Sequence, residues 1–579
     1  MAQDKTKGIR IRIFAVEAVF FLFVLLLGVK AYQIQVLDGD ILREKAEKEY
    51  TGFIEVQGKR GEIFDRNDSR LGTTIDAYSV AVSPVKNTSP AEDARALAGI
   101  LNLHAGEVEQ ILASKKRFAW IKKRISPDQA DRIRKLKIDG VFFKNDAIRF
   151  YPNRTLAAQV VGFTGSDGNG LEGIEYQYND LLKGSDVRIN ITKDAKGKYF
   201  DTEKRLKTRY KGESLSLTID SDIQYIAESA LKTSVVKNRA TSGMAIVMQP
   251  KTGEILAMAH YPPFNPNVFS DYPRKRWRNR AVTDPFEPGS VMKVFVAAAA
   301  MDRGYCTPKT IFFCENGAYP VGRSIVHDTH DYGWLTLSQI IKYSSNIGAV
   351  KITETTGNKA LFDAISSFGF GRKSGINCPG ETAGSLSSYR QWSTIDAGAI
   401  SFGQGVSVSG LQLICGISAI ANNGLLMKPR LVKKIYSNTK RVKKEFFPVP
   451  VKQVISPKSA KRIKEMMRRV VEPEGTGTQA AVKGYSVCGK TGTAQKVASD
   501  GSGYSKKDYT AVFAGFAPKT TPELAVLVVI DEPRKHHYGG VVAAPVFQQI
   551  VAESFNHLNI PPDMGQERLV AKLSEGGRH

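Results

Sequence analysis

The chain has 579 residues, of which 42% are hydrophobic, and a formal net charge of +25. This length and apolar content suit roughly two to four globular domains. The basic residues are spread over several segments without a recognisable nucleic-acid module, so we expect no nucleic-acid partner. The charge instead favours a surface that lies near anionic lipid or an anionic polymer.

The cysteine and histidine content argues against a disulfide-based scaffold and against a metal site. Five cysteines are few and odd in number, so disulfides are not the scaffold of the fold. Cys306 and Cys314 are close enough in sequence to pair in an oxidising compartment, and the sequence leaves this open. No histidine or cysteine cluster has metal-ligand spacing, so we expect no metal site and no cofactor.

The first segment, residues 13–36, contains the apolar run IFAVEAVFFLFVLLLGV, which is interrupted by a single charge, Glu17. It is about as long as a bilayer is thick, and no small-residue cleavage site follows it. Basic residues in 1–12 precede it, which predicts a cytoplasmic N-terminus and an extracytoplasmic remainder. We therefore expect an uncleaved signal anchor in the inner (cytoplasmic) membrane. A buried helix is the alternative, but no polar stripe interrupts the run.

Residues 37–210 combine short alternating runs with a helical stretch, which predicts an α+β module without a catalytic constellation. Residues 211–557 read as a second domain. Two strands, MAIVMQ and EILAMAHY, flank a turn at PKTG, and strands return near the end as YTAVFAGFAP and ELAVLVVIDEP. With helices between them, these strands predict an α/β domain with one sheet whose edges come from distant parts of the chain. Residues 558–579 form a polar tail.

The segment DPFEPGSVMKVFVAAAAMDRG places Ser290 after a Pro-Gly turn and Lys293 one helical turn later. One interpretation is a helix capped by Ser290, with Lys293 snorkelling along the core. The other is a nucleophile with its general base, at a helix N-terminus that favours developing negative charge. Other Ser-x-x-Lys matches lack this turn-and-helix context: Ser83 to Lys86, Ser234 to Lys237, and Ser437 to Lys440.

Two further motifs follow in order. Ser344 and Asn346, in IIKYSSNIGAV, offer a polar pair for proton transfer, although a helix cap before an apolar run explains the same letters. Lys490, Thr491, Gly492 and Thr493 offer a cationic strand with hydroxyls that suit a carboxylate. A second Lys-Thr-Gly, at Lys251, is better explained as a turn between strands.

The ordered set Ser290-x-x-Lys293, Ser344-x-Asn346 and Lys490-Thr-Gly-Thr is the triple signature of penicillin-binding proteins and serine β-lactamases. The chain resembles class B penicillin-binding proteins nearly end to end. RGEIFDRND and RFYPNRTLAAQVVGFTGSDGNGLEGIEYQYNDLLKG resemble the family's N-terminal pedestal (dimerisation-type) module. SFGQGVSVSGLQL and ANNGLLMKPRLV resemble its transpeptidase domain, and the ending HHYGGVVAAPVF favours the septal branch.

The resemblance implies a fold and a mechanism. The fold is a mostly antiparallel sheet flanked by helices, beside an α+β pedestal and one transmembrane helix. Ser290 would attack a D-Ala carbonyl of a peptidoglycan stem peptide, with Lys293 as base, Ser344 as proton relay and Asn346 holding the substrate amide. Lys490, Thr491 and Thr493 would bind the terminal carboxylate, and the amides of Ser290 and Thr493 would form the oxyanion hole.

The resemblance also implies ligands and partners. β-Lactams would acylate Ser290. Without a polymerase-like module, the chain would depend on an FtsW-type glycosyltransferase and other division proteins. Three alternatives stay open at this stage: an elongation-branch transpeptidase, a membrane-anchored β-lactam sensor, and a carboxypeptidase.

Overall fold

The computed structural model describes residues 3–56, 58–185, 187–192, 210–322, 324–498 and 503–564. The chain divides into two compact units, one made of residues 1–59 and 184–211 and the other of residues 60–183 and 212–579. Most of the Lys-rich stretch KDAKGKYFDTEKRLKTRYKGE, which begins at residue 193, and most of the predicted polar tail lie outside the described residues.

The first unit consists of a long helix followed by a short helix and a strand pair. Helix α1 (Gln3–Tyr32) continues through a π-helical turn (Gln33–Leu37), and α2 (Gly39–Tyr50) follows. Strands β1 (Thr51–Val56) and β6 (Val187–Thr192) pair antiparallel. Within the described residues, Lys7–Leu37 is the one helical span long and apolar enough to cross a membrane, with a mean hydropathy of 2.4.

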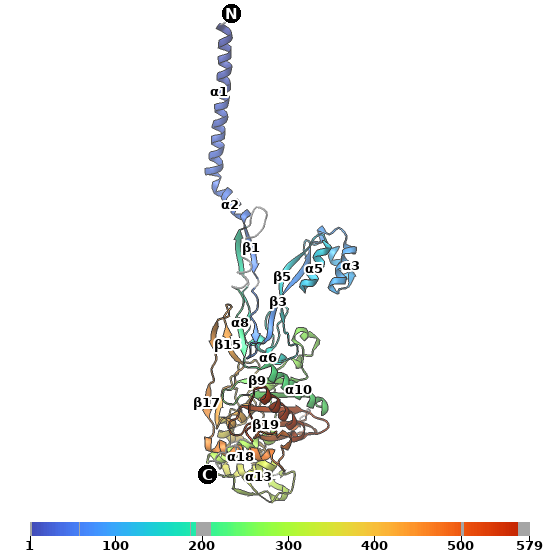
Figure 1. The fold of residues 1–579 in the computed structure, drawn as a ribbon, viewed down its shortest axis with the longest axis vertical. Coiled ribbons are helices and arrows are strands. Elements are labelled where there is room, and N and C mark those ends of the chain that lie inside the picture. Colours follow the sequence, from blue (N-terminus) through green and yellow to red (C-terminus); the bar gives the residue numbers. More distant parts are fainter. Residues whose placement is uncertain are drawn as a thin grey trace, which may run out of the picture. The chain divides into compact units, whose positions relative to one another are not determined.

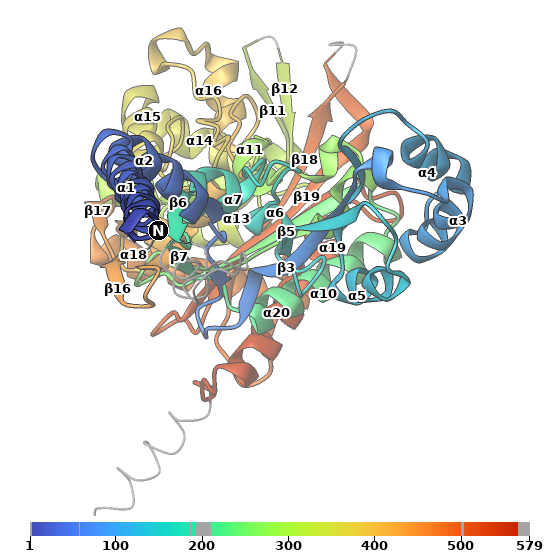
Figure 2. The same ribbon diagram turned by 90° about the horizontal axis from the view of Figure 1, so that it is seen from above.

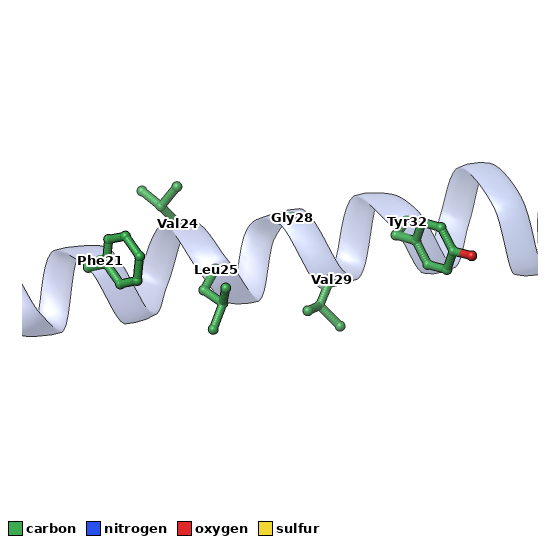
Figure 3. A pocket seen from close by; sticks show the side chains of 6 residues that line it. All are labelled: Phe21, Val24, Leu25, Gly28, Val29 and Tyr32. Atoms are coloured by element: carbon green, nitrogen blue, oxygen red, sulfur yellow. The ribbon is translucent and has the colours of Figure 1, made fainter.

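The apolar side chains of α1 are exposed along its length, because no other described element of this unit packs against them. Figure 3 shows one such stretch, where side chains project from the helix on either side of Gly28. Exposed apolar surface of this extent is typical of a lipid-facing helix. The unit is thus compatible with the predicted single-pass anchor.

The second unit begins with a mixed sheet of seven strands in the order β16-β15-β7-β2-β3-β4, with β5 also paired to β3. Three helices pack against β3, β4 and β5 around a separate apolar core (Figure 1). The strands are β2 (Ile63–Phe64), β3 (Arg70–Val82), β4 (Ala119–Ile125), β5 (Val141–Phe150), β7 (Ser214–Leu217), β15 (Val432–Tyr436) and β16 (Val442–Glu445). The helices of this part are α3 (Pro90–Leu101), α4 (Ala105–Leu112), α5 (Pro127–Leu136), α6 (Ala158–Val161), α7 (Gly173–Gln177) and α8 (Asn179–Leu182).

The main sheet of the second unit has five antiparallel strands in the order β18-β19-β20-β8-β9. These are β18 (Cys488–Val497), β19 (Tyr504–Ala517), β20 (Leu524–Asp531), β8 (Ser242–Met248) and β9 (Ile255–Tyr261). The edges β9 and β18 are far apart in sequence, which confirms the predicted sheet. The predicted turn at Lys251 is also confirmed, since it joins β8 to β9 and Gly253 has a φ of +74°.

Helices cover both faces of this sheet, because its buried side chains alternate between two apolar cores. Helices α10 (Ser221–Lys237) and α20 (Ala544–His557) pack on one face, and α17 (Gly410–Ala421) and α12 (Met292–Asp302) belong to the core on the other. Figure 2 shows α10 and α20 on the opposite side of β18 and β19 from α14 (Asn346–Thr356) and α16 (Thr394–Ser401).

The remaining elements of this unit are short strand pairs and helices. The strand pairs are β10 (Ile311–Phe313) with β13 (Trp334–Thr336), β11 (Ala318–Val321) with β12 (Ser324–His327), and β14 (Leu425–Met427) with β17 (Pro450–Gln453). The helices are α11 (Arg280–Thr283), α13 (Leu337–Tyr343), α15 (Asn358–Ser367), α18 (Pro457–Val471) and α19 (Gly539–Val542). All five cysteines are buried free thiols, so Cys306 and Cys314 form no disulfide in this structure.

Candidate active site

Ser290 lies in a 3₁₀ turn, Gly289–Val291, that leads directly into α12. Pro288 precedes the turn and Val291 precedes α12, and neither residue makes a side-chain capping hydrogen bond. The interpretation of Ser290 as an N-cap is therefore wrong, because Ser290 lies inside the 3₁₀ turn and is not the residue that precedes either helical element. Within the described residues the hydroxyl has no hydrogen-bond partner and is half-buried, so it is free to react.

Lys293 is fully buried in the first turn of α12. Its Nζ donates to the backbone oxygen of Ser344 and to Oδ1 of Asn346 at 2.7 Å, and lies 3.3 Å from Oγ of Ser344. The snorkelling interpretation is wrong as well, since the amino group points at polar partners inside the protein instead of at solvent. Every neighbour on α12 from Met292 to Met301 is buried too.

Ser344 and Asn346 lie where α13 ends and α14 begins. Ser344 takes the left-handed conformation at φ +67°, and Ser345 is the residue that caps α14, accepting a hydrogen bond from the amide of Gly348 at 2.9 Å. The helix-cap interpretation of this motif is thus correct for Ser345 alone. The cap leaves the side chains of Ser344 and Asn346 turned toward Lys293.

Lys490 lies on the edge strand β18 and is also fully buried. Its Nζ donates to Oγ of Ser344 at 2.8 Å. Further along the strand, Oγ1 of Thr493 accepts from the amide of Gly539 at 3.1 Å, and Oγ1 of Thr491 lies 2.8 Å from Oγ1 of Thr476. Because the Gly539 amide occupies one lone pair, the hydroxyl hydrogen of Thr493 is left to point elsewhere.

Two glycines let the Ser290 turn pack directly on β18. A β-carbon at Gly492 would lie 2.7 Å from the backbone oxygen of Pro288 and 3.0 Å from the side chain of Val291. Gly289 has a φ of +56°, and a β-carbon there would lie 3.3 Å from the backbone of Thr493. The backbone of the turn is therefore close to that of Thr493, which brings the two predicted oxyanion-hole residues together.

Burial governs the charge of both lysines. It lowers the pKa of Lys293 to about 7, and the carboxylate of Asp328 opposes this shift. Burial, followed by repulsion from Lys293, lowers the pKa of Lys490 well below its ordinary value. An amine with a pKa near neutrality exchanges protons readily at physiological pH. The arrangement suits acyl transfer by a serine, with a buried amine as base and a second hydroxyl beside it.

Comparisons with known proteins agree with this site. Residues 243–552 match the model of the penicillin binding protein transpeptidase domain, and residues 55–217 match that of the penicillin-binding protein dimerisation domain. The chain belongs to the penicillin-binding protein transpeptidase family.

Relatives of this penicillin-binding protein span several organisms. It is 34% identical to the probable peptidoglycan D,D-transpeptidase PbpC of Pseudomonas aeruginosa over 96% of this chain and 97% of the relative. It is 36% identical to the stage V sporulation protein D of Bacillus subtilis (94% and 86%) and 33% identical to the peptidoglycan D,D-transpeptidase FtsI of Escherichia coli (93% and 90%).

A solved structure of penicillin-binding protein 3 from Mycobacterium tuberculosis, in complex with aztreonam, is similar in fold. The TM-score is 0.69 at 28% sequence identity, covering 88% of this chain and 98% of that one. The predicted penicillin-binding fold and the predicted resemblance to class B, septal-type proteins are confirmed by these findings.

The structure adds residues to the site of this penicillin-binding protein that sequence reasoning missed. Thr476 binds Thr491, Gly539 binds Thr493, and Asp328 binds the start of α14. None of the three belongs to the ordered motifs. For Gly539, the sequence signal is the Gly-Gly pair at residues 539 and 540, which lies inside the segment HHYGGVVAAPVF.

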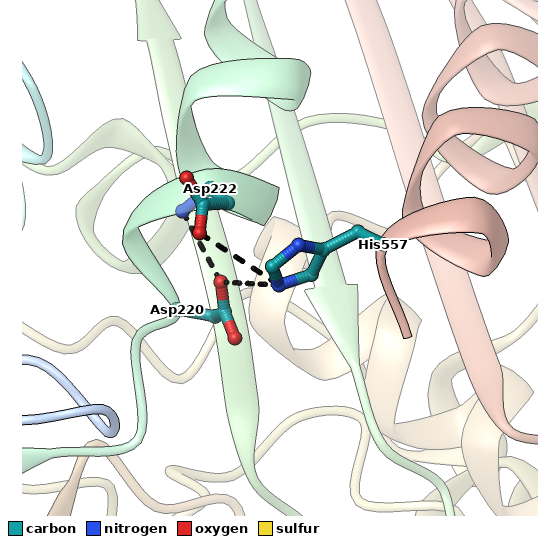
Figure 4. A group of neighbouring side chains, drawn as sticks. All are labelled: Asp220, Asp222 and His557. Carbon is teal, nitrogen blue, oxygen red and sulfur yellow. Dashed lines mark hydrogen bonds and ion pairs between the residues drawn. The ribbon is translucent and has the colours of Figure 1, made fainter. Parts of the chain in front are cut away.

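One group outside the site has the composition of a cation site. Asp220, Asp222 and His557 bring a ring nitrogen and carboxylate oxygens within 4.8 Å of one another (Figure 4). However, Oδ1 of Asp220 already accepts from two amides at the start of α10, and Oδ2 accepts from Asn67. We interpret the group as a helix cap that also pairs with His557, at 3.4 Å from Asp220.

Proposed function

We propose that this penicillin-binding protein is a peptidoglycan D,D-transpeptidase that cross-links stem peptides through an acyl-enzyme on Ser290. The observation that carries the proposal is the hydroxyl of Ser344, which two buried lysines contact beside the Ser290 turn. Members of the same family with this name share about a third of its residues over nearly its whole length.

The first half of the reaction forms the acyl-enzyme. Lys293 in its neutral form takes the proton of Ser290 as Oγ bonds to the carbonyl carbon of the penultimate D-Ala. The negative charge that develops on the carbonyl oxygen lies against the amides of Ser290 and Thr493, at the start of a helix. The bond to the terminal D-Ala then breaks, and Ser344 passes a proton to the leaving nitrogen.

The second half returns the enzyme to its starting state. An amine of a neighbouring stem peptide attacks the ester carbonyl and gives up a proton to neutral Lys293. The bond to Oγ of Ser290 breaks as the cross-link forms, and Lys293 returns the proton to Oγ. Asn346 binds the amide of the donor stem. Its Nδ2 donates to the backbone oxygen of His327 at 2.9 Å, which holds the side chain in place beside Lys293.

The terminal carboxylate of the donor stem suits the cationic strand. Lys490, Thr491 and Thr493 line β18 with one amino group and two hydroxyls. Burial and Lys293 disfavour the charged form of Lys490. The negative charge of a bound carboxylate favours that form, so it raises the pKa of this lysine. Binding of a carboxylate substrate, or of the carboxylate of a β-lactam, is therefore coupled to proton uptake.

The direct test supplies a lipid-linked disaccharide pentapeptide and an active glycan polymerase to the full-length protein in detergent. We expect cross-linked dimers, release of D-Ala, and loss of both with a β-lactam. Release of D-Ala with tetrapeptides and without dimers would identify a carboxypeptidase. No D-Ala release, with β-lactam acylation intact, would support a sensor.

We further propose a topology and domain organisation. Residues 1–12 are cytoplasmic, residues 13–36 span the inner membrane, a pedestal spans 37–210, and the extracytoplasmic transpeptidase domain spans 211–557. The charge before the apolar helix supports this orientation. Protease added to spheroplasts should digest the chain beyond residue 36, and its full protection would contradict the orientation.

We also propose a septal role, with an FtsW-type glycosyltransferase and other division proteins as partners. The relatives named FtsI support the septal assignment, and the ending HHYGGVVAAPVF is consistent with it. Depletion of the protein should give filaments, and it should co-purify with the division polymerase. Round, widened cells after depletion would instead place it in the elongation branch.

A further inference from the structure

Asp328 follows the β11–β12 hairpin and uses both carboxylate oxygens on the start of α14. Oδ2 accepts a hydrogen bond from Oγ of Ser345 at 2.5 Å, and Oδ1 accepts from the amides of Asn346 and, at 3.1 Å, Ile347. A carboxylate at a helix N-terminus is favoured by the helix dipole and satisfies amides that the helix leaves unpaired. Through these hydrogen bonds, the residue that follows the hairpin holds the motif that contains Ser344 and Asn346 in place.

The same connection fixes which atom of Asn346 faces the base. Its Nδ2 donates to the backbone oxygen of His327, the residue before Asp328, so its Oδ1 is the atom that faces Nζ of Lys293, at 2.7 Å. The backbone amide and the side-chain amide of Asn346 are thus both held by the same two residues. A shift of Asp328 would move Asn346 and rotate its side chain.

Charge gives Asp328 a second effect on Lys293. Its carboxylate favours the ammonium form and opposes burial, which lowers the pKa of Lys293 to about 7. Lys293 in turn acts on Lys490, whose own pKa burial lowers, and Asp328 acts on two groups whose pKa burial raises, Cys314 and Tyr332. Lys351 pairs with Glu315 close to Cys314. Among these described neighbours, Asp328 is the carboxylate that acts on the base.

We propose that Asp328 is a positioning residue for acyl transfer, which holds Asn346 and Ser344 against Lys293 and supplies the negative charge that faces this base. The proposal rests on the proposed function, because it assigns Asp328 a role in the reaction of Ser290. It names a residue outside the three ordered motifs, and it makes the β11–β12 hairpin part of the site's support.

The test is the pH profile of acylation by a fluorescent β-lactam, measured on the full-length protein. Asp328→Asn keeps the shape of the side chain and one acceptor oxygen but removes the charge. We expect its second-order rate constant at the plateau to fall at least about tenfold, since misplacement of a reacting group by an ångström has effects of that order or larger. We also expect the midpoint of the acidic limb to move to lower pH, because Lys293 loses the charge that favours its ammonium form.

Two further variants separate position from charge. Asp331→Asn changes an exposed carboxylate three residues away and should leave both the plateau and the midpoint at the wild-type values. Asp328→Glu keeps the charge and lengthens the side chain, so its plateau should fall while its midpoint stays near the wild-type value. If a thermal unfolding assay shows that Asp328→Asn does not fold, the plateau of Asp328→Glu tests the positioning role.

A wild-type plateau in either Asp328 variant would overturn the positioning role, and an unmoved midpoint in Asp328→Asn would overturn the role of its charge. A wild-type protein that the label does not modify at Ser290 would instead contradict the proposed function, before Asp328 is considered. The two failures are therefore distinguishable.

Discussion

Lys293 and Lys490 contact the same hydroxyl: their Nζ atoms lie 3.3 Å and 2.8 Å from Oγ of Ser344. Both lysines are fully buried, so two positive charges on either side of one oxygen are disfavoured by desolvation and by mutual repulsion. The site therefore favours at least one neutral amine near physiological pH. A neutral amine next to the Ser290 turn is what a general base requires.

The first prediction concerns the pH dependence of acylation. Lys293 acts as a base only when neutral, and its pKa lies near 7. The acylation rate of the wild-type protein should therefore rise with pH, with a midpoint near 7 and about a tenfold loss for each unit below it. Stopped-flow measurements with a chromogenic β-lactam test this. A rate that stays constant down to pH 5 would exclude Lys293 as the base.

The second prediction concerns the contact between β18 and the Ser290 turn. In Gly492→Ala the added carbon meets the backbone oxygen of Pro288, which cannot move as a flexible side chain would. We expect roughly 1–3 kcal/mol lower stability from overpacking and an acylation rate lower by about tenfold or more. Gly99→Ala is the matched control, since nothing lies within 4 Å of a β-carbon there. Equal acylation by both variants would show that the close approach is not required.

The third prediction concerns a carboxyl between helix α10 and the turn before α6. Oε1 of Glu228 accepts from the amide of Ala157 at 2.9 Å and from Gln224 at 2.8 Å, and burial raises the pKa of Glu228 to about 7. Because the pKa is higher in the folded state than in the unfolded state, the stability that Glu228 contributes is fully present below about pH 4.5 and is lost as the pH rises through about 7.

Glu228→Gln removes the ionisable group and, with it, the loss of stability as the pH rises. The variant should be more stable than the wild type at pH 8, by up to about 3 kcal/mol, and the difference should shrink toward pH 4.5. Thermal unfolding at the two pH values measures this, with Glu553→Gln as an exposed control. A variant that is less stable at pH 8 would mean that the hydrogen-bond geometry outweighs the cost of the buried charge.

The fold and the central residues of the site could be predicted from the sequence for a physical reason. The central residues of the site belong to local motifs whose order along the chain is specific: Ser290, Lys293, Ser344, Asn346 and Lys490. The alternation of apolar residues predicts the strands of the main sheet. The helical bounds differed at Ser290, because a 3₁₀ turn precedes α12 and no residue letter distinguishes it from a cap.

The supporting residues could not be predicted in the same way. Asp328 and Thr476 lie in loops, and each acts through a contact with a residue more than a dozen positions away. Strand β15 joins the sheet of the pedestal although it follows the second motif, so the predicted domain boundary does not separate two sheets. Such pairings depend on the tertiary fold instead of on local pattern.

The most direct test of the account is the site of covalent modification by a labelled β-lactam. Peptide mapping of the wild-type protein should place the label on Ser290, and Ser290→Ala should carry none while its thermal unfolding stays close to that of the wild type. Lys251→Ala alters the exposed Lys-Thr-Gly turn and should be labelled at the wild-type rate. A Ser290→Ala protein that is labelled with normal kinetics would contradict the assignment of the nucleophile and, with it, the mechanism.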